Sequence, residues 1–243
     1  MYFKILPIAL ATLCFGTVLA QEPNAAAAKQ QKLAALKQSM AKNQAELKQY
    51  AWTETTQISL KGEVKKQEKK QCQYGPDGKV QKTPLQGANQ PPSEQGGGGR
   101  RRGNGAMKKA VVEKKVGEMK DYMERVAALV HEYVPPNPQK IQAAQAAGNI
   151  AITPAQPIST INIKNYLKQG DSVALGFDTT AKKMASYNVD SYLDNPKDDA
   201  VKLAVNFAQL PDGTSYPQQT VLDATGKKIE VKVTNSDYKK LGQ

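Results

Sequence analysis

Histidine occurs once in this chain, which limits the catalytic chemistry that the sequence can support. Serine or cysteine hydrolysis with a histidine base would have to use His131, yet no Gly-x-Ser-x-Gly or comparable nucleophile motif accompanies it. The sequence has no second histidine and no thiol cluster for a metal site, and no GxxxxGK[ST] loop for phosphate. A surface or helix-capping role is therefore predicted for His131.

The carboxylates offer a second route to acid–base chemistry. Asp198 and Asp199 are adjacent, and Asp190 and Asp194 lie near predicted hairpins, where acids are mostly solvated. Glu54 has the strand parity of its apolar neighbours, so it is either a perturbed acid on the apolar face or the partner of one of the many lysines. We favour the lysine partner. The sequence thus predicts a protein that is not an enzyme and needs no cofactor.

Basic residues point to a binding function instead. The chain has 34 basic and 22 acidic residues and a formal net charge of +12. Such an excess favours anionic partners, either an anionic membrane surface or a polymer. Arg100, Arg101 and Arg102 lie in a Gly/Arg-rich stretch, 86–106, that is predicted to be a disordered loop and to bind anions. No aromatic residues interleave these arginines, so nucleic acid is not an expected partner.

The first 20 residues have the pattern of a secretory signal peptide. Lys4 is followed by an apolar run, and Val18 and Ala20 supply the small residues at positions −3 and −1 of a cleavage site near Ala20. The alternative, an uncleaved anchor, would need about 20 apolar residues, which this run does not reach. An exported protein of the periplasm or the extracellular space is predicted. Cleavage would leave Cys72 as the only cysteine, either a packing residue or an intermolecular bridge.

Helical periodicity is strongest between Met107 and Val134. Apolar residues recur there at alternating steps of four and three, which places them on one stripe of a helix. A shorter helix is predicted over Pro138–Ala147, and an N-terminal helix over Lys29–Tyr50. The stripe of the long helix consists of Val112, Val116, Met119, Met123, Val126, Val130 and Tyr133.

Strand-like alternation occurs in two blocks, roughly 52–84 and 158–235, on either side of the long helix. No helix-length segment separates strands within a block, so an antiparallel sheet is expected. The prediction is an α+β fold, a curved antiparallel sheet or half-open barrel of about 8–9 strands with an N-terminal helix and inserted amphipathic helices. Residues 21–243 are expected to form a single domain and a monomer.

The C-terminal residues also carry a family resemblance. The stretch from Tyr216-Pro217 to the turn Asp223–Gly226 and on through Ile229 and Val231 resembles the closing hairpin of the periplasmic lipoprotein-carrier (LolA-like) superfamily. The resemblance implies a half-open barrel whose apolar concave face is covered by helices acting as a lid, with lipid or lipoprotein acyl chains bound between them.

Two interpretations of the predicted helix–sheet layer stay open. In the first, apolar side chains line a cavity for acyl chains; in the second, helix and sheet fill each other's space as a solid core. The residues predicted to line the cavity are Trp52, Ile58, Leu60, Met119, Met123, Phe177, Val205 and Phe207. The alternative function is that of an envelope interaction protein whose basic surface binds anionic lipid head groups or cell-wall polymer without a ligand cavity.

Overall fold

A computed structural model describes residues 41–85 and 105–242. The chain divides into two compact units, Met1–Lys42 and Asn43–Gln243, and the structure below is that of the second unit. The predicted signal peptide, residues 1–20, lies outside the described residues, as do Arg100, Arg101 and Arg102. Most of the predicted N-terminal helix also lies outside them, and its described end is helical over residues 41–47.

The second unit contains ten described strands and two described α-helices. The helices are α2 (Gly105–His131) and α3 (Pro138–Ala146), and a 3₁₀ turn spans Thr225–Lys227. The strands are β1 (Tyr50–Leu60), β2 (Glu63–Tyr74), β3 (Val80–Pro84), β4 (Ile150–Thr153), β5 (Ile158–Lys164), β6 (Ser172–Asp178), β7 (Lys183–Tyr192), β8 (Ala200–Gln209), β9 (Ser215–Ala224) and β10 (Ile229–Lys240).

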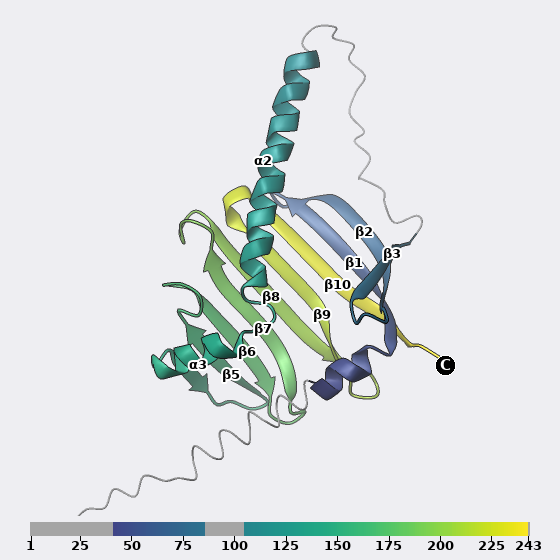
Figure 1. The fold of residues 1–243 in the computed structure, drawn as a ribbon, viewed down its shortest axis with the longest axis vertical. Coiled ribbons are helices and arrows are strands. Elements are labelled where there is room, and N and C mark those ends of the chain that lie inside the picture. The colour runs from purple at the N-terminus through teal and green to yellow at the C-terminus, as the bar shows by residue number, and fades with distance from the viewer. Residues whose placement is uncertain (1–40, 86–104, 243) are drawn as a thin grey trace, which may run out of the picture. The chain divides into compact units, whose positions relative to one another are not determined.

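All ten strands form one antiparallel sheet in the order β3-β2-β1-β10-β9-β8-β7-β6-β5-β4 (Figure 1). The predicted assembly of a single antiparallel sheet from the two sequence blocks is confirmed. β1, the first strand of the N-terminal block, pairs with β10, the last strand of the C-terminal block. The sheet is not closed into a barrel: β3 and β4 are its edges. The described structure is thus an α+β fold.

Three boundaries differ from the prediction. The alternation that begins at Trp52 predicts a strand that continues through Val64. This prediction is wrong, because the chain reverses at Lys61 and Gly62, whose φ angles of 55° and 83° are those of a tight hairpin turn. β4 was not predicted, since four residues directly after a helix carry too little alternation to be recognised. Tyr50 begins β1 and does not end a helix. The unpredicted β4 raises the number of strands from the predicted 8–9 to ten.

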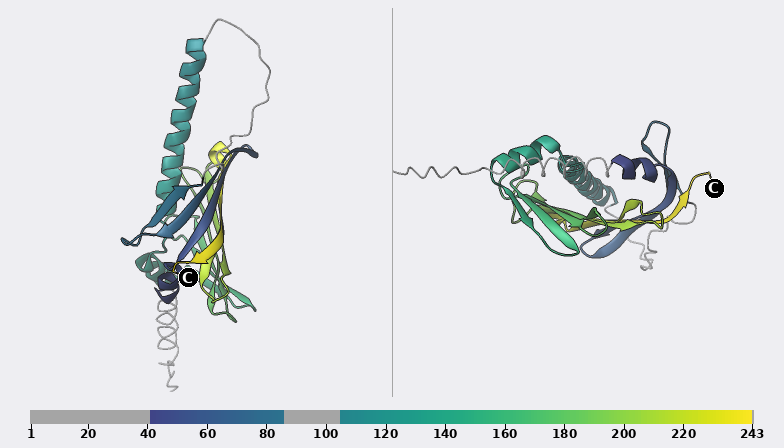
Figure 2. Two further views of the ribbon diagram at one scale, coloured as in Figure 1. Left: turned by 90° about the vertical axis from the view of Figure 1, so that its right-hand side faces the viewer. Right: turned by 90° about the horizontal axis from the view of Figure 1, so that it is seen from below.

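One face of the sheet is covered by α2 and α3 (Figure 2). Alternation along β8 shows why: Val201 and Leu203 are 2% and 6% exposed on the covered face, whereas Lys202 between them points away. The buried side chains form a larger and a smaller cluster, and Leu129, Val130 and Leu222 pack against both. The larger cluster is Tyr133, Ala144, Ile163, Tyr166, Val173, Tyr187, Val189 and Leu203, and the smaller one is Tyr122, Val126, Val201, Ala224 and Ile229.

The two helices are positioned by ordinary local signals. Asn137 caps α3, since its side-chain oxygen accepts a hydrogen bond from the backbone N–H of Gln139 at 2.8 Å, and Pro138 occupies the first turn. His131 is exposed in the last turn of α2, as predicted. Neither helix is long and apolar enough, over its described residues, to cross a bilayer.

Candidate functional site

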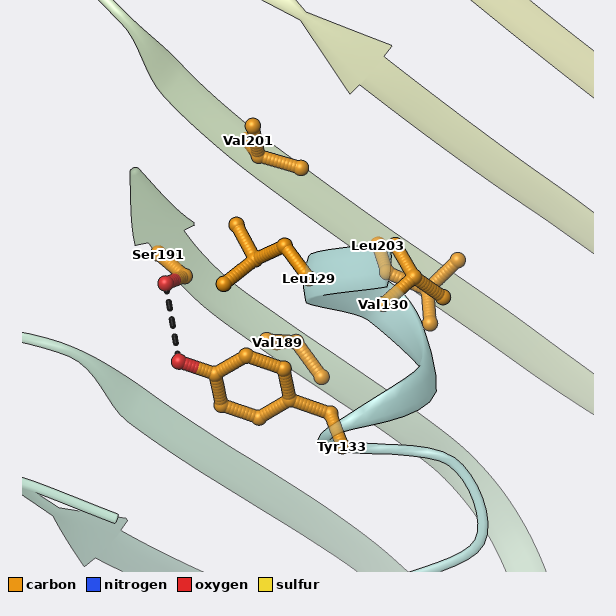
Figure 3. Close-up of a pocket in the computed structure, with 7 residues that line it drawn as sticks. All are labelled: Leu129, Val130, Tyr133, Val189, Ser191, Val201 and Leu203. Carbon is orange, nitrogen blue, oxygen red and sulfur yellow. Dashed lines mark hydrogen bonds between the residues drawn. The ribbon is translucent and has the colours of Figure 1, made fainter. Parts of the chain in front are cut away.

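The layer between the end of α2 and the sheet is filled by side chains. Leu129, Val130 and Tyr133 face three apolar residues of β7 and β8, Val189, Val201 and Leu203 (Figure 3). The cavity that these side chains line, together with Ser191, measures about 10 Å³. A single water molecule needs about that much space, whereas ligand pockets run to roughly 300 Å³ or more. This part of the layer is packed as a solid core.

The residues predicted to line a cavity do not come together around one space. Ile58, Leu60, Met119 and Met123 pack against the smaller cluster, and Val205 and Phe207 against the larger one. Phe177 is partly buried on β6 and belongs to neither cluster as the described residues define them. Trp52 lies in a third group.

That third group is aromatic and joins strands that are remote in the sequence. The Trp52 ring stacks on the Tyr238 ring, with centroids 5.6 Å apart and an angle of 10° between the planes. Tyr74 lies 5.6 Å from Trp52, and Tyr216 lies 4.4 Å from Tyr238. Cys72, on the strand beside Trp52, is fully buried, and burial raises the pKa of its thiol. This placement agrees with a packing role for Cys72.

Two of the candidate acid–base residues, Glu54 and Asp194, have charged structural partners. Both carboxylate oxygens of Glu54 accept hydrogen bonds from the Lys82 ammonium, at 2.7 and 2.6 Å, so the predicted lysine partner is confirmed. Asp194 accepts a hydrogen bond from Arg125 at 2.6 Å, and that bond lowers the pKa of Asp194. Within 41–85 and 105–242, no three potential metal ligands come together.

A buried polar network that the sequence did not reveal holds the chain just after α2. Tyr133 donates a hydrogen bond to Asp171 at 2.6 Å, and Ser191 lies 2.8 Å from the same Tyr133 oxygen. Asp171 also accepts hydrogen bonds from three consecutive backbone N–H groups, 166–168, at 2.6 to 3.0 Å. Tyr187 donates to the Tyr133 carbonyl at 2.6 Å. Burial raises the pKa of the Tyr133 hydroxyl, which therefore stays protonated as a donor.

The middle of α2 has its own polar contact with the sheet. Tyr122, 7% exposed, donates a hydrogen bond to Asp199 at 3.0 Å. Burial, followed by this hydrogen bond, raises the pKa of Tyr122 to about 12. The predicted stripe omitted Tyr122 because the four-and-three spacing selected Met119 and Met123, which flank it and are only partly buried.

The first half of α2 lies beyond this packing. Val116, which was predicted to be buried, is 63% exposed, and the nearby Lys114, Lys115 and Lys120 are exposed as well. Figure 1 and the side view in Figure 2 show α2 extending past the sheet. The residues that precede Met119 in α2 span about 20 Å at the rise of an α-helix. The prediction for Val116 was wrong because periodicity identifies a face but not the element that covers it.

The uncovered face of the sheet has a shallow depression of about 380 Å³. Its lining is mostly small or polar, so it has neither the apolar character that an acyl chain requires nor an excess of basic charge. The lining residues are Ser172, Ala174, Asn188, Val189, Asp190, Lys202, Leu203, Ala204, Val221 and Asp223.

Comparison of the chain with protein-family models, with curated proteins and with solved structures found no match.

Proposed function

We propose that this protein is an exported, non-enzymatic envelope protein that binds an anionic lipid surface through the projecting half of α2. One observation carries the proposal: Val116 is 63% exposed on a helix whose neighbouring lysines are exposed too. An isolated exposed valine needs no explanation. A valine on an apolar stripe that continues into a buried core is exposed only because the sheet ends beneath it.

The arrangement of charge around Val116 suits a membrane interface. At 100° per residue, Lys115 and Lys120 lie on opposite sides of the stripe, while Glu118 and Asp121 lie on the far face of the helix. Lysines that flank an apolar stripe can place their ammonium groups among lipid head groups while the stripe enters the interface. A soluble anionic polymer would use the lysines but would gain nothing from the valine.

Charge should supply most of the binding free energy. Residues 100–120 contain eight basic and two acidic residues, counting Arg100, Arg101 and Arg102. A basic residue close to an anionic membrane contributes about 1 kcal/mol. Partial burial of one or two valines adds roughly the same amount per side chain. Binding is therefore expected to weaken steeply with salt.

The acyl-chain carrier implied by the family resemblance is a different proposal, and no observation in the described residues favours it over the surface binder. The view from below in Figure 2 supports the half-open barrel, since the strands follow an arc around α2 and α3. A carrier would need α2 to leave its place on the sheet, because the space near Leu129 and Tyr133 is about 10 Å³.

Vesicle co-sedimentation of the full chain tests the surface binder. The protein is expected to bind phosphatidylglycerol vesicles and not phosphatidylcholine vesicles, and to be released by salt. Replacing Lys115 and Lys120 by alanine should weaken binding by about thirtyfold, at about 1 kcal/mol per lysine. The matched control replaces Lys69 and Lys79 by alanine. Both lysines are exposed in the β1–β3 region, and their replacement removes the same charge.

Val116→Ser separates a lipid surface from a polymer. The variant should bind vesicles several-fold more weakly while its binding to a soluble anionic polysaccharide stays unchanged. Equal losses in the two double-lysine variants would refute the proposed site. Binding to the polysaccharide but not to phosphatidylglycerol vesicles would refute the lipid and leave a polymer binder.

A further inference from the structure

The two edges of the sheet differ in how they are protected against pairing with another strand. β3, at one edge, carries Lys82, is preceded by Lys79 and ends in Pro84. Lysine and proline at an edge discourage pairing with a further strand. β4, at the other edge, has the sequence Ile-Ala-Ile-Thr. It lies within a stretch between Lys140 and Lys164 that contains no charged residue, in a chain that is 23% charged.

The backbone groups of β4 that no described strand pairs can be assigned from its pairing with β5. The Asn149 carbonyl accepts a hydrogen bond from the Lys164 N–H at 2.9 Å, and Ile150 lies opposite Ile163. Hydrogen-bonded and non-hydrogen-bonded pairs alternate along an antiparallel ladder. Ala151 therefore points its N–H and C=O groups toward β5, while Ile150 and Ile152 point theirs to the outside.

We propose that β4 is a self-association edge, at which a second copy of this chain adds its own β4 in antiparallel orientation. A twofold axis through Ala151 places Ile150 of one copy opposite Ile152 of the other, and the reverse. This register lets the two outward-facing residues of each copy exchange four backbone hydrogen bonds. It also covers Ile152, which is 64% exposed and lies on the same face as Ile150.

The sequence of β4 favours a second copy as the occupant, because Ile-Ala-Ile is symmetric about Ala151 and therefore matches its own twofold-related copy. Two molecules with a net charge of +12 repel each other through most surfaces, and the uncharged stretch around β4 is where that repulsion is smallest. A four-residue edge buries little area, so the dimer should be weak and should dissociate on dilution. The monomer expected from the sequence is then the species present at low protein concentration.

Cysteine cross-linking tests the register directly, in a Cys14→Ser background, since Cys72 is fully buried. Ala151→Cys places two thiols on the twofold axis in a non-hydrogen-bonded pair, with Cα atoms about 4.5 Å apart, and should form a disulfide-linked dimer under mild oxidation. Thr153→Cys is the matched control, because its two copies would lie roughly 13 Å apart, too far for a disulfide. Equal cross-linking of the two variants, or none of either, overturns the proposal.

Sedimentation equilibrium over a wide concentration range gives the second test. The mass should rise toward that of a dimer at high concentration, and more so at higher salt, because salt screens the repulsion. Ile152→Lys should abolish the rise, whereas Val80→Lys on the opposite edge should leave it unchanged. A single-chain mass at every concentration, or the same loss in both variants, overturns the proposal. Salt has the opposite effect on vesicle binding, so the two proposals fail independently.

Discussion

The two halves of α2 share one backbone conformation and one apolar stripe, yet they have opposite surroundings. Val126 is fully buried against the sheet, and Val116, ten residues earlier, is 63% exposed. The packed half ends at the Tyr133–Asp171 contact and the projecting half ends near a run of basic residues. An amphipathic stripe therefore shows which face of a helix favours burial, but the sheet covers that face along only part of α2.

Asp171→Ala should have the largest effect, because it removes the acceptor that fixes the chain after the packed half. Tyr133 and three backbone N–H groups would lose their partner in a buried site. The free energy of unfolding, measured with urea, should fall by about 3 kcal/mol or more. The control is Asp190→Ala on β7, whose side chain is 62% exposed. A similar loss in both variants would mean that the network does not anchor α2.

Val126→Ala and Val116→Ala make the same chemical change in the two halves. The first leaves a small cavity in a packed cluster and should lower the free energy of unfolding by about 1–3 kcal/mol. The second should change it by less than about 0.5 kcal/mol, since the side chain is already in solvent. Urea unfolding of both variants measures the difference. Comparable losses would show that the projecting half is covered in solution.

Tyr122→Phe should cost about 1 kcal/mol at neutral pH, by removing the hydrogen bond to Asp199. Its effect should change with alkaline pH. The pKa of Tyr122 is raised to about 12 in the folded chain, while an unfolded tyrosine ionises near pH 10. The unfolded state therefore loses its proton first, so the stability of the parent falls as pH rises from about 10 to 12. The variant should show a shallower fall, and an identical slope would contradict this assignment.

Local patterns predicted the elements that depend on local chemistry. The short helix that begins at Pro138 and the alternation of the strands in the second block, as in β8, appear where their residues indicated. The failures occurred where local signals were weak or misleading. Lys61-Gly62 lacks the usual turn residue before glycine, and in the sequence the apolar parity of β1 continues to Val64. The four residues of β4 become a strand only because β5 offers a ladder.

Some features of the candidate site could likewise be predicted from the sequence, and others could not. The basic excess and the amphipathic character of α2 are properties of the sequence, and so was the lysine partner of Glu54, although not its identity as Lys82. The Tyr133–Asp171 network joins groups 38 positions apart, and the Trp52–Tyr238 stack joins β1 to β10. Neither contact therefore produces a periodic pattern in the sequence. Sequence spacing gives faces and turns, whereas contacts between remote residues depend on the whole sheet.

The sequence by itself determined the class of fold, the length of the long helix and the sign of the charge, because propensity, periodicity and ionisation are properties of short stretches. Only the tertiary structure decided that the sheet covers α2 from Met119 onward but not at Val116, that side chains fill the space near Leu129, and that β4 is an uncharged edge of the described sheet. Those outcomes depend on strand order and register, which set where a buried surface stops and which backbone groups remain unpaired.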